Sequence, residues 1–183
     1  MKDLFHKHSA ELRETLANLD GWHAEVARVV ELLQQTFAAG GTVYAAGNGG
    51  SATLAQHLSD EMVGRYKSNR PPLRVVALSA DSAVITCIGN DFGFEEVFAR
   101  QVEGLGRAGD VLLAYSTSGN SPNILAACRA AKQLKMSTIA FTGGDGKLRE
   151  MADLVVTSPG QNTARIQELD LHAIHLICEA FEP

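Results

Sequence analysis

Several features are scarce in this chain of 183 residues, and each scarcity excludes a class of protein. The three cysteines, Cys87, Cys128 and Cys178, are odd in number and widely spaced, which argues against a disulfide framework or a structural zinc knuckle. No apolar run approaches the roughly 20 residues of a membrane-spanning helix. The first twelve residues carry no apolar signal-peptide core. We therefore expect a cytoplasmic protein that does not contact a membrane.

Positive charge is scarce as well. Lysine and arginine number 16 against 21 aspartates and glutamates, which leaves a formal net charge of -5. Nucleic-acid backbones and anionic membranes reward clustered basic residues, so we expect no nucleic-acid partner. The hydrophobic share of 45% and the charged share of 20% are typical of a soluble globular protein. The length fits a single domain, residues 1–183, with a sizeable core.

Short apolar runs alternate with helical patterns over most of the chain. This alternation predicts an α/β fold, in which a parallel sheet is flanked by helices as in flavodoxin-like and Rossmann-like three-layer sandwiches. The predicted strands cover residues 42–46, 73–78, 111–115, 137–141 and 154–157. The predicted helices cover residues 52–66, 81–88, 94–105, 123–134, 148–152 and 164–182.

The first forty residues lie outside this alternation. Their apolar residues recur at near-helical spacing, which predicts a pair of N-terminal helices within residues 1–40. Asp20-Gly21 predicts the break between the two helices, and Gly40-Gly41 predicts the end of the second. We expect this helical pair to cap the core or to pack against a neighbouring subunit.

Two polar turns each follow a predicted strand and precede a predicted helix. The first is Gly47-Asn48-Gly49-Gly50-Ser51, and the second is Ser-Thr-Ser-Gly-Asn-Ser at 116–121. Ligands of open parallel sheets bind at the carboxyl ends of the strands, and helix N-termini attract phosphate. Serine and asparagine also commonly cap helices without binding anything. Two such turns, one with four hydroxyl groups, favour a small phosphorylated ligand. Neither turn has the Walker or dinucleotide pattern.

A second group of residues carries side chains suited to chemistry. His57 and Glu61 are four residues apart and share one face of a predicted helix, while Gln167 and His175 lie on the last helix. Two imidazoles, a carboxylate and an amide suit zinc or a similar ion. A carboxylate and an imidazole also suit general base and acid catalysis. A surface hydrogen bond at 57 and 61 and a core histidine at 175 are the structural alternatives.

The spacing of the last two residues constrains such a site. Gln167 and His175 are eight residues apart, roughly 12 Å along a helix, so both reach one ion only with difficulty. We therefore hypothesise that the site lies where subunits meet. Mixing subunits altered at Glu61 with subunits altered at His175 would test the sharing.

With these residues identified, the chain resembles the sugar isomerase (SIS) domain family over nearly its whole length. Within that family it is most similar to the isomerases that act on sedoheptulose 7-phosphate. The resemblance rests on an ordered set of motifs: 47–51 with His57 and Glu61, Gly64-Arg65-Tyr66, Gly89-Asn90-Asp91-Phe92-Gly93, Gly109-Asp110-Val111-Leu112, 116–121, and Arg165-Ile166-Gln167-Glu168 with His175.

The resemblance implies an aldose–ketose isomerase, an intramolecular oxidoreductase that converts D-sedoheptulose 7-phosphate to D-glycero-D-manno-heptose 7-phosphate. This step begins the synthesis of the heptose of bacterial surface polysaccharides such as lipopolysaccharide. The family implies a cytoplasmic homotetramer with its sites between subunits. It implies Glu61 as the base and His175 as the acid of an enediol mechanism, and one zinc per subunit held by His57, Glu61, Gln167 and His175. The sugar-phosphate contacts implied are Asn48, Gly49, Gly50, Ser51, Glu61, Asn90, Asp91, Ser116, Thr117, Ser118, Ser121 and Gln167.

Two positions depart from the family pattern. Leu54 stands where many members carry Asp, and Asp170 stands where His is common. The alternative function comes from a non-catalytic relative, a tetramer that binds the bacterial replication initiator protein and lacks the catalytic carboxylate and imidazole. A module that senses a sugar phosphate without converting it is a further alternative. The presence of both Glu61 and His175 favours the enzyme.

Overall fold

The computed structural model describes residues 1–183 and contains one five-stranded sheet. All strand pairs are parallel, in the order β2-β1-β3-β4-β5, which is the flavodoxin-like arrangement. The predicted α/β fold with a parallel sheet is therefore confirmed. The strands are β1 (Val43–Ala46), β2 (Val75–Ala77), β3 (Val111–Tyr115), β4 (Ser137–Thr142) and β5 (Leu154–Thr157).

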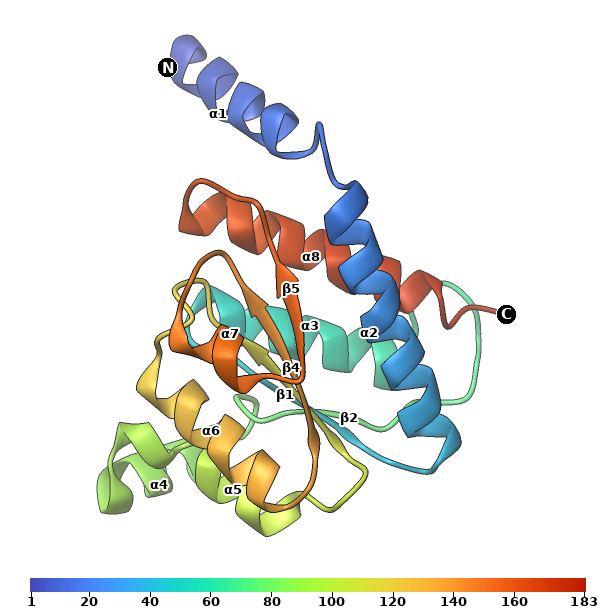
Figure 1. Ribbon diagram of the computed structural model, residues 1–183, viewed down its shortest axis with the longest axis vertical. Coiled ribbons are helices and arrows are strands. Elements are labelled where there is room, and N and C mark those ends of the chain that lie inside the picture. Colours follow the sequence, from blue (N-terminus) through green and yellow to red (C-terminus); the bar gives the residue numbers. More distant parts are fainter.

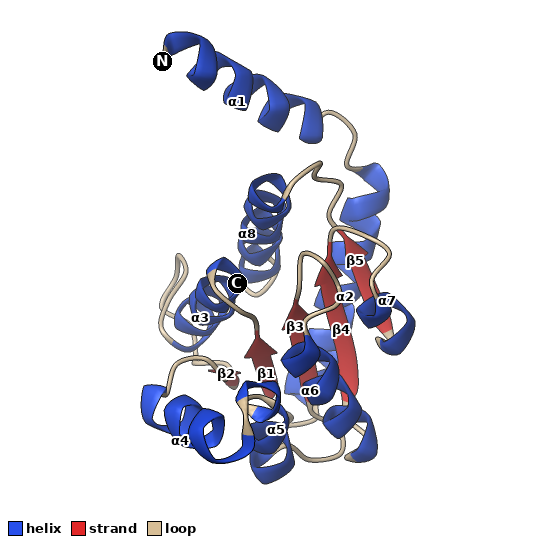
Figure 2. Ribbon diagram, turned by 90° about the vertical axis from the view of Figure 1, so that its left-hand side faces the viewer, coloured by secondary structure: helices blue, strands red, loops and turns tan.

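Helices cover both faces of the sheet and make three layers (Figure 2). One face packs against α2 (Asp20–Ala38), α3 (Gly50–Val63) and α8 (Thr163–Glu179). The other packs against α4 (Ser82–Phe92), α5 (Ala99–Leu105), α6 (Pro122–Gln133) and α7 (Lys147–Met151). Because strand side chains alternate, Leu113 joins the first core and Leu112 the second. Both faces of the sheet are covered by helices, so the strand sequences are continuous apolar runs.

The N-terminal helices are α1 (Lys2–Thr15) and α2, and the predicted break between them is wrong by a few residues. The chain leaves the first helix at Leu16, and Asp20 and Gly21 form the first turn of α2 instead of a break. Leu19 is buried in the core, which fixes where α2 begins. The negative charge of Asp20 in the first turn is stabilised by the positive end of the helix dipole. Helix α1 projects from the body and has no buried residue (Figure 1).

Two predicted helix boundaries on the second face also differ from the structure. Helix α4 continues to Phe92, beyond the expected end at Ile88, so Asn90 and Asp91 are helical. Its start is well defined, because the Asp81 carboxylate accepts hydrogen bonds from the N–H groups of Ala83 and Val84. The helix expected at 94–105 divides into a short 3-10 turn, Phe94–Glu96, and α5. None of the helices is long and apolar enough to cross a membrane.

Candidate functional site

The two polar turns lie side by side because β1 and β3 are neighbours in the sheet. The first turn follows Ala46 at the end of β1, and the second follows Tyr115 at the end of β3. The side-chain amides of Asn48 and Asn123 join them, each donating to the other's oxygen at 2.8 Å. Asn123 is buried and was not among the predicted site residues, although it follows the second turn directly. The amide pair therefore holds the two turns next to each other.

The second turn, residues 116–121, offers hydrogen-bond donors. The backbone N–H groups of Thr117, Ser118 and Ser121 have no partner within the chain. Ser121 occupies the N-cap position of α6, yet its side chain does not cap the helix and instead accepts from the Ser116 hydroxyl at 3.2 Å. Gly119 has a φ of 64°, which turns the backbone into a concave loop. Free N–H groups at a helix N-terminus suit an anion, and the binding role of this turn stays a prediction.

The first turn, residues 47–51, approaches the last helix closely. Gly49 has a φ of 55° and precedes the first residue of α3. A Cβ atom at Gly50 would lie 2.7 Å from Nε2 of Gln167, so a side chain there would displace this amide. The Gln167 side chain therefore sits at the N-terminal end of α3, beside the first turn.

His57, Glu61 and His175 converge farther along the same two helices. The Nε2 atoms of His57 and His175 are 3.2 Å apart, and Oε1 of Glu61 is 3.5 Å from Nε2 of His57. All three side chains are half-buried, and one ligand atom from each lies within 4.8 Å of the others. Helices α3 and α8 lie side by side, which brings residues 118 positions apart into contact (Figure 1). This group could hold a metal ion.

The donor atoms fit a small divalent cation. In a tetrahedral site with bonds of about 2.0–2.1 Å, two ligand atoms lie about 3.3 Å apart. The two measured separations, 3.2 Å and 3.5 Å, lie on either side of that value. Two imidazole nitrogens and a carboxylate oxygen also match the ligand types that zinc accepts. His57 thus lies at a tetrahedral edge length from both His175 and Glu61, while the ligand atoms of Glu61 and His175 lie within 4.8 Å of each other.

The surroundings of the group restrict which other residues take part. The Tyr66 ring stacks on His175 with centroids 5.9 Å apart and covers one side of the imidazole. Cys178 lies one turn along α8, and burial raises the pKa of its thiol to about 12. Its thiol is not among the ligand atoms that lie within 4.8 Å of one another. Tyr66 belongs to the Gly64–Tyr66 motif, but the sequence alone did not indicate its stacking role.

Gln167 does not join the group within one chain. Its amide contacts Gly50, while His57 lies two helical turns farther along α3. A cavity of about 330 Å³ beside Gly50 is lined by Leu54 and Leu171 along with Gln167. That the site lies where subunits meet stays a prediction, and it concerns Gln167, because Glu61 and His175 meet within the chain. Of the four predicted metal ligands, the structure brings three together.

Comparison with known proteins places this site in a family. A model of the SIS domain matches residues 7–143. The phosphoheptose isomerase of Akkermansia muciniphila is 43% identical over 92% of this chain and 88% of its own length. That of Burkholderia pseudomallei is 48% identical over 87% of this chain and 81% of its own length. The chain belongs to the phosphoheptose isomerase family. A phosphoheptose isomerase structure from Neisseria gonorrhoeae superimposes with a TM-score of 0.88 at 41% identity, over 97% of this chain and 96% of the other.

Two expected contact residues of the phosphoheptose isomerase pattern lie apart from the turns. Asn90 and Asp91 are exposed at the end of α4, where the Asn90 amide donates to Oδ1 of Asp91 at 2.7 Å. The Cys87 thiol is the other neighbour of Asp91, at 3.8 Å. Neither side chain makes a hydrogen bond to residues 47–51 or 116–121. Their role in binding stays a prediction.

The two departures from the phosphoheptose isomerase pattern have different surroundings. Leu54 lines the cavity between α3 and α8, so it lies beside the site. Asp170 is fully buried on the core side of α8, where it accepts the Ser158 hydroxyl at 2.6 Å. Burial raises the pKa of Asp170 to about 7, and the Ser158 hydrogen bond only partly opposes this. Asp170 is thus a core residue.

Proposed function

We propose that this chain converts D-sedoheptulose 7-phosphate to D-glycero-D-manno-heptose 7-phosphate, the first step in making the heptose of bacterial surface polysaccharides. The observation that carries the proposal is the meeting of Glu61, His57 and His175 in one half-buried group. The unpaired N–H groups of residues 116–121 support a phosphorylated ligand. Membership of the phosphoheptose isomerase family supports the choice of substrate.

The side chains of the group suit an enediol mechanism. The Glu61 carboxylate removes a proton from C1 of the ketose, and the electron pair forms the C1–C2 double bond while His175 donates a proton to the C2 oxygen. Return of the proton from Glu61 to C2, with loss of the C1 hydroxyl proton to His175, gives the aldose. No atom is gained or lost. One Glu61 oxygen faces His57 at 3.5 Å, which leaves the second oxygen to accept the proton.

Zinc is the cation that we assign to this group. His57, Glu61 and His175 would hold it, with Gln167 of a neighbouring subunit as the fourth ligand, since Gln167 of the same chain lies beside Gly50. When bound, the ion polarises the sugar carbonyl as a Lewis acid. The phosphate end of the sugar would rest on the free N–H groups and hydroxyls of residues 116–121, and residues 47–51 with Asn90 and Asp91 would contact its chain.

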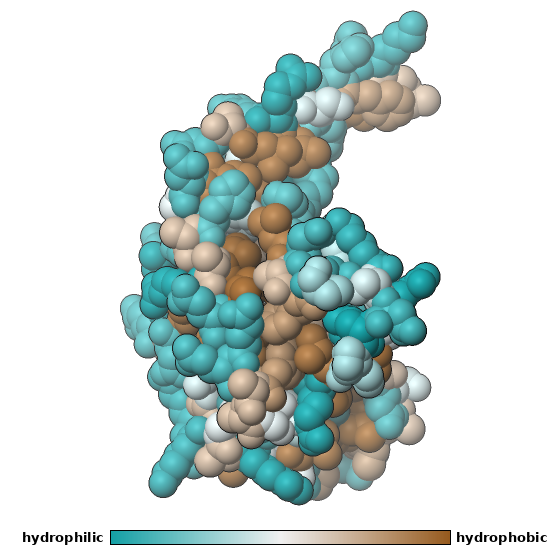
Figure 3. Space-filling model, turned by 90° about the vertical axis from the view of Figure 1, so that its right-hand side faces the viewer, coloured by the Kyte–Doolittle hydropathy of each residue, from teal (hydrophilic) through white to brown (hydrophobic).

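The assembly that we propose is a homotetramer with the sites between subunits. Helix α1 exposes Leu4 and Phe5, and none of its residues is buried within the chain. Figure 3 shows brown, apolar surface both on the projecting N-terminal segment and on the body below it. An isolated helix of this length is marginal in water, so a neighbouring subunit is the natural cover for α1. Three free cysteines suit a reducing cytoplasm.

The direct test is turnover of sedoheptulose 7-phosphate by purified protein, first stripped with a chelator and then resupplied with zinc. We expect the aldose to accumulate when zinc is present, and we expect its rate of formation to fall strongly when zinc is removed. Calorimetry with the same sugar phosphate separates binding from conversion. Binding without any conversion in either condition would contradict the isomerase and support the non-catalytic alternatives, a sugar-phosphate sensor or a binding partner of the replication initiator.

A further inference from the structure

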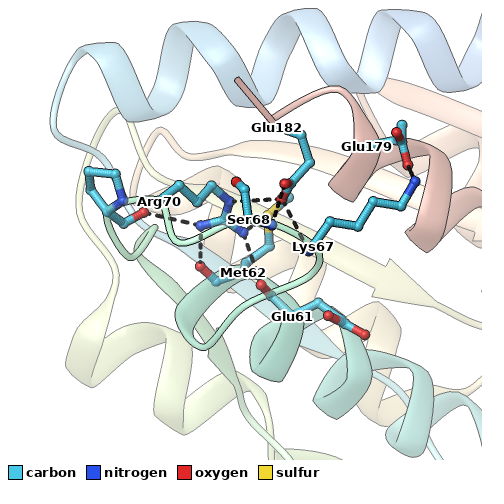
Figure 4. A network of polar contacts seen from close by, with 8 residues as sticks. Glu61, Met62, Lys67, Ser68, Arg70, Glu179 and Glu182 are labelled. Carbon is cyan, nitrogen blue, oxygen red and sulfur yellow. Dashed lines mark hydrogen bonds and ion pairs between the residues drawn. The ribbon is translucent and has the colours of Figure 1, made fainter.

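The segment of residues 64–74, which leaves α3 and returns to β2, closes the C-terminal end of α3 with an arginine (Figure 4). The last carbonyl groups of a helix have no partner within it. Here Nη2 of Arg70 donates to the Glu61 carbonyl at 2.9 Å, and Nη1 donates to the Met62 carbonyl at 2.9 Å. The guanidinium thus binds the backbone of the residue whose carboxylate belongs to the metal-binding group. Its positive charge also suits the negative end of the helix.

The same arginine is tied to the end of the chain. Nε of Arg70 lies 3.7 Å from Oε1 of Glu182, and the two side chains are 7% and 11% exposed. Oε2 of Glu182 accepts from the Ser68 N–H at 2.7 Å, so the carboxylate also holds the segment itself. Glu182 follows α8, the helix that carries His175. A nearly buried ion pair therefore connects the end of α3 to the end of α8.

This connection bears on the site because its ligands come from these two helices. Glu61 lies in the last turn of α3, and His175 lies about two turns before Glu182. The separation of the carboxylate and the imidazole depends on how the helix ends are held. We propose that Arg70 and Glu182 are positioning residues, which set the distance between Glu61 and His175 and so the affinity of the group for a divalent cation. The inference rests on the metal role given under the proposed function.

The chain offers a matched control. Lys67 and Glu179 form a second ion pair between the same segment and α8, but their side chains are 59% and 51% exposed. Exposed ion pairs are screened by solvent and contribute little to holding two segments together. If any link between segment and helix sufficed, both pairs would matter. The geometry assigns the role to Arg70 and Glu182 alone, because only that pair contacts the backbone of Glu61.

The test is a cobalt titration of chelator-treated protein, followed by visible absorption, for wild type, Arg70→Met, Glu182→Gln, Lys67→Met and Glu179→Gln. We expect the first two variants to lose about tenfold or more in cobalt affinity, as residues that orient ligands typically do. Lys67→Met and Glu179→Gln should bind like wild type. With zinc, kcat of Arg70→Met should fall while KM for the sugar phosphate stays within about twofold. The reason is that the Arg70–Glu182 ion pair, here called the clamp, does not touch residues 116–121.

The outcomes separate the clamp from the function on which it rests. Cobalt binding by Arg70→Met and Glu182→Gln at wild-type affinity would overturn the positioning role alone. No cobalt binding by wild type, or unchanged binding by His175→Ala, would overturn the metal role and the clamp with it. Only variants whose circular dichroism spectrum matches that of wild type are compared. If Arg70→Met does not fold, Glu182→Gln decides, because its amide oxygen still accepts from Ser68 and only the charge is removed.

Discussion

The Nε2 atoms of His57 and His175 face each other at 3.2 Å across the neighbouring helices α3 and α8. Two imidazole nitrogens at this distance share either one proton or one cation, because two N–H groups cannot both donate to each other. With Glu61 beside them, the arrangement suits a cation when one is bound and a shared proton when none is. This relationship explains why α3 and α8 must keep a fixed separation, and the predictions below depend on it.

Subunit mixing tests whether the site is shared. Because Glu61 and His175 meet in one chain, mixing a Glu61→Gln protein with a His175→Ala protein should restore no activity. Mixing Glu61→Gln with Gln167→Ala should restore it, since some sites then combine an intact group with an intact Gln167 from a neighbour. Random exchange leaves about a quarter of the sites complete. Zinc-dependent turnover after exchange is the measurement, and full inactivity of the second mixture would remove Gln167 from the shared site.

Gly119 tests the phosphate turn. Its φ of 64° disfavours any other residue, and a Cβ atom there would lie 2.9 Å from the Gly146 Cα. We expect Gly119→Ala to raise KM for sedoheptulose 7-phosphate by about tenfold or more and to weaken inhibition by inorganic phosphate, because the free N–H groups would move. Gly144→Ala is the matched control, since no atom lies within 4 Å of its added Cβ. Equal effects of the two substitutions would argue against phosphate binding at residues 116–121.

Asp170 predicts an unusual dependence of stability on pH. Its pKa is about 7 in the folded chain against 3.8 for the free side chain, so between these values the folded state holds a proton that the unfolded state has released. The free energy of unfolding therefore falls as pH rises through this window, by at most about 1.4 kcal/mol per pH unit from this group, and levels off above about pH 7.

Asp170→Asn removes this titration, while its amide oxygen can still accept the Ser158 hydroxyl. We expect the variant to be more stable than wild type above pH 7, with the difference shrinking toward pH 4. The measurement is urea denaturation of chelator-treated protein at several pH values. Asp60→Asn, at an exposed position, is the control. A variant with the same pH slope as wild type would show that Asp170 is charged in the folded state at neutral pH.

Helix α1 tests the assembly. We expect the double variant Leu4→Ser and Phe5→Ser to shift the protein from a tetramer to smaller species, because both side chains are exposed within one chain. Light scattering across a concentration series would detect the shift. The variant Lys2→Ser and Lys7→Ser changes the same helix without removing apolar surface and should remain a tetramer. An unchanged mass for the first variant would mean that α1 does not hold the subunits together.

Much of the fold could be predicted because local pattern and global structure agree. Strands such as 111–115 are apolar on both faces, which is what a sheet covered on two sides requires. The break between the first helices was misplaced because the burial of Leu19, a tertiary effect, determines where α2 begins. A glycine in the first turn of a helix is tolerated, so Asp20-Gly21 was a weak signal.

The site was predictable only where neighbours in sequence are neighbours in space. His57 and Glu61 share a helix face and are therefore visible in the sequence. The contact of His57 with His175 and the pairing of Asn48 with Asn123 depend on strand order and helix packing, which spacing alone does not provide. The same holds for Arg70, whose guanidinium becomes meaningful only when its partners at Glu61 and Glu182 are known.

Nuclear magnetic resonance of the reaction in deuterium oxide tests the central claim most directly. Wild-type protein with zinc should convert sedoheptulose 7-phosphate to an aldose that carries deuterium at C2, because Glu61 exchanges its proton with solvent before returning it. Glu61→Gln should lower the rate by at least about 100-fold while still binding the sugar phosphate, and Asp60→Asn should leave the rate unchanged. Product formation by Glu61→Gln at the wild-type rate, or no product from wild type with zinc, would contradict the account.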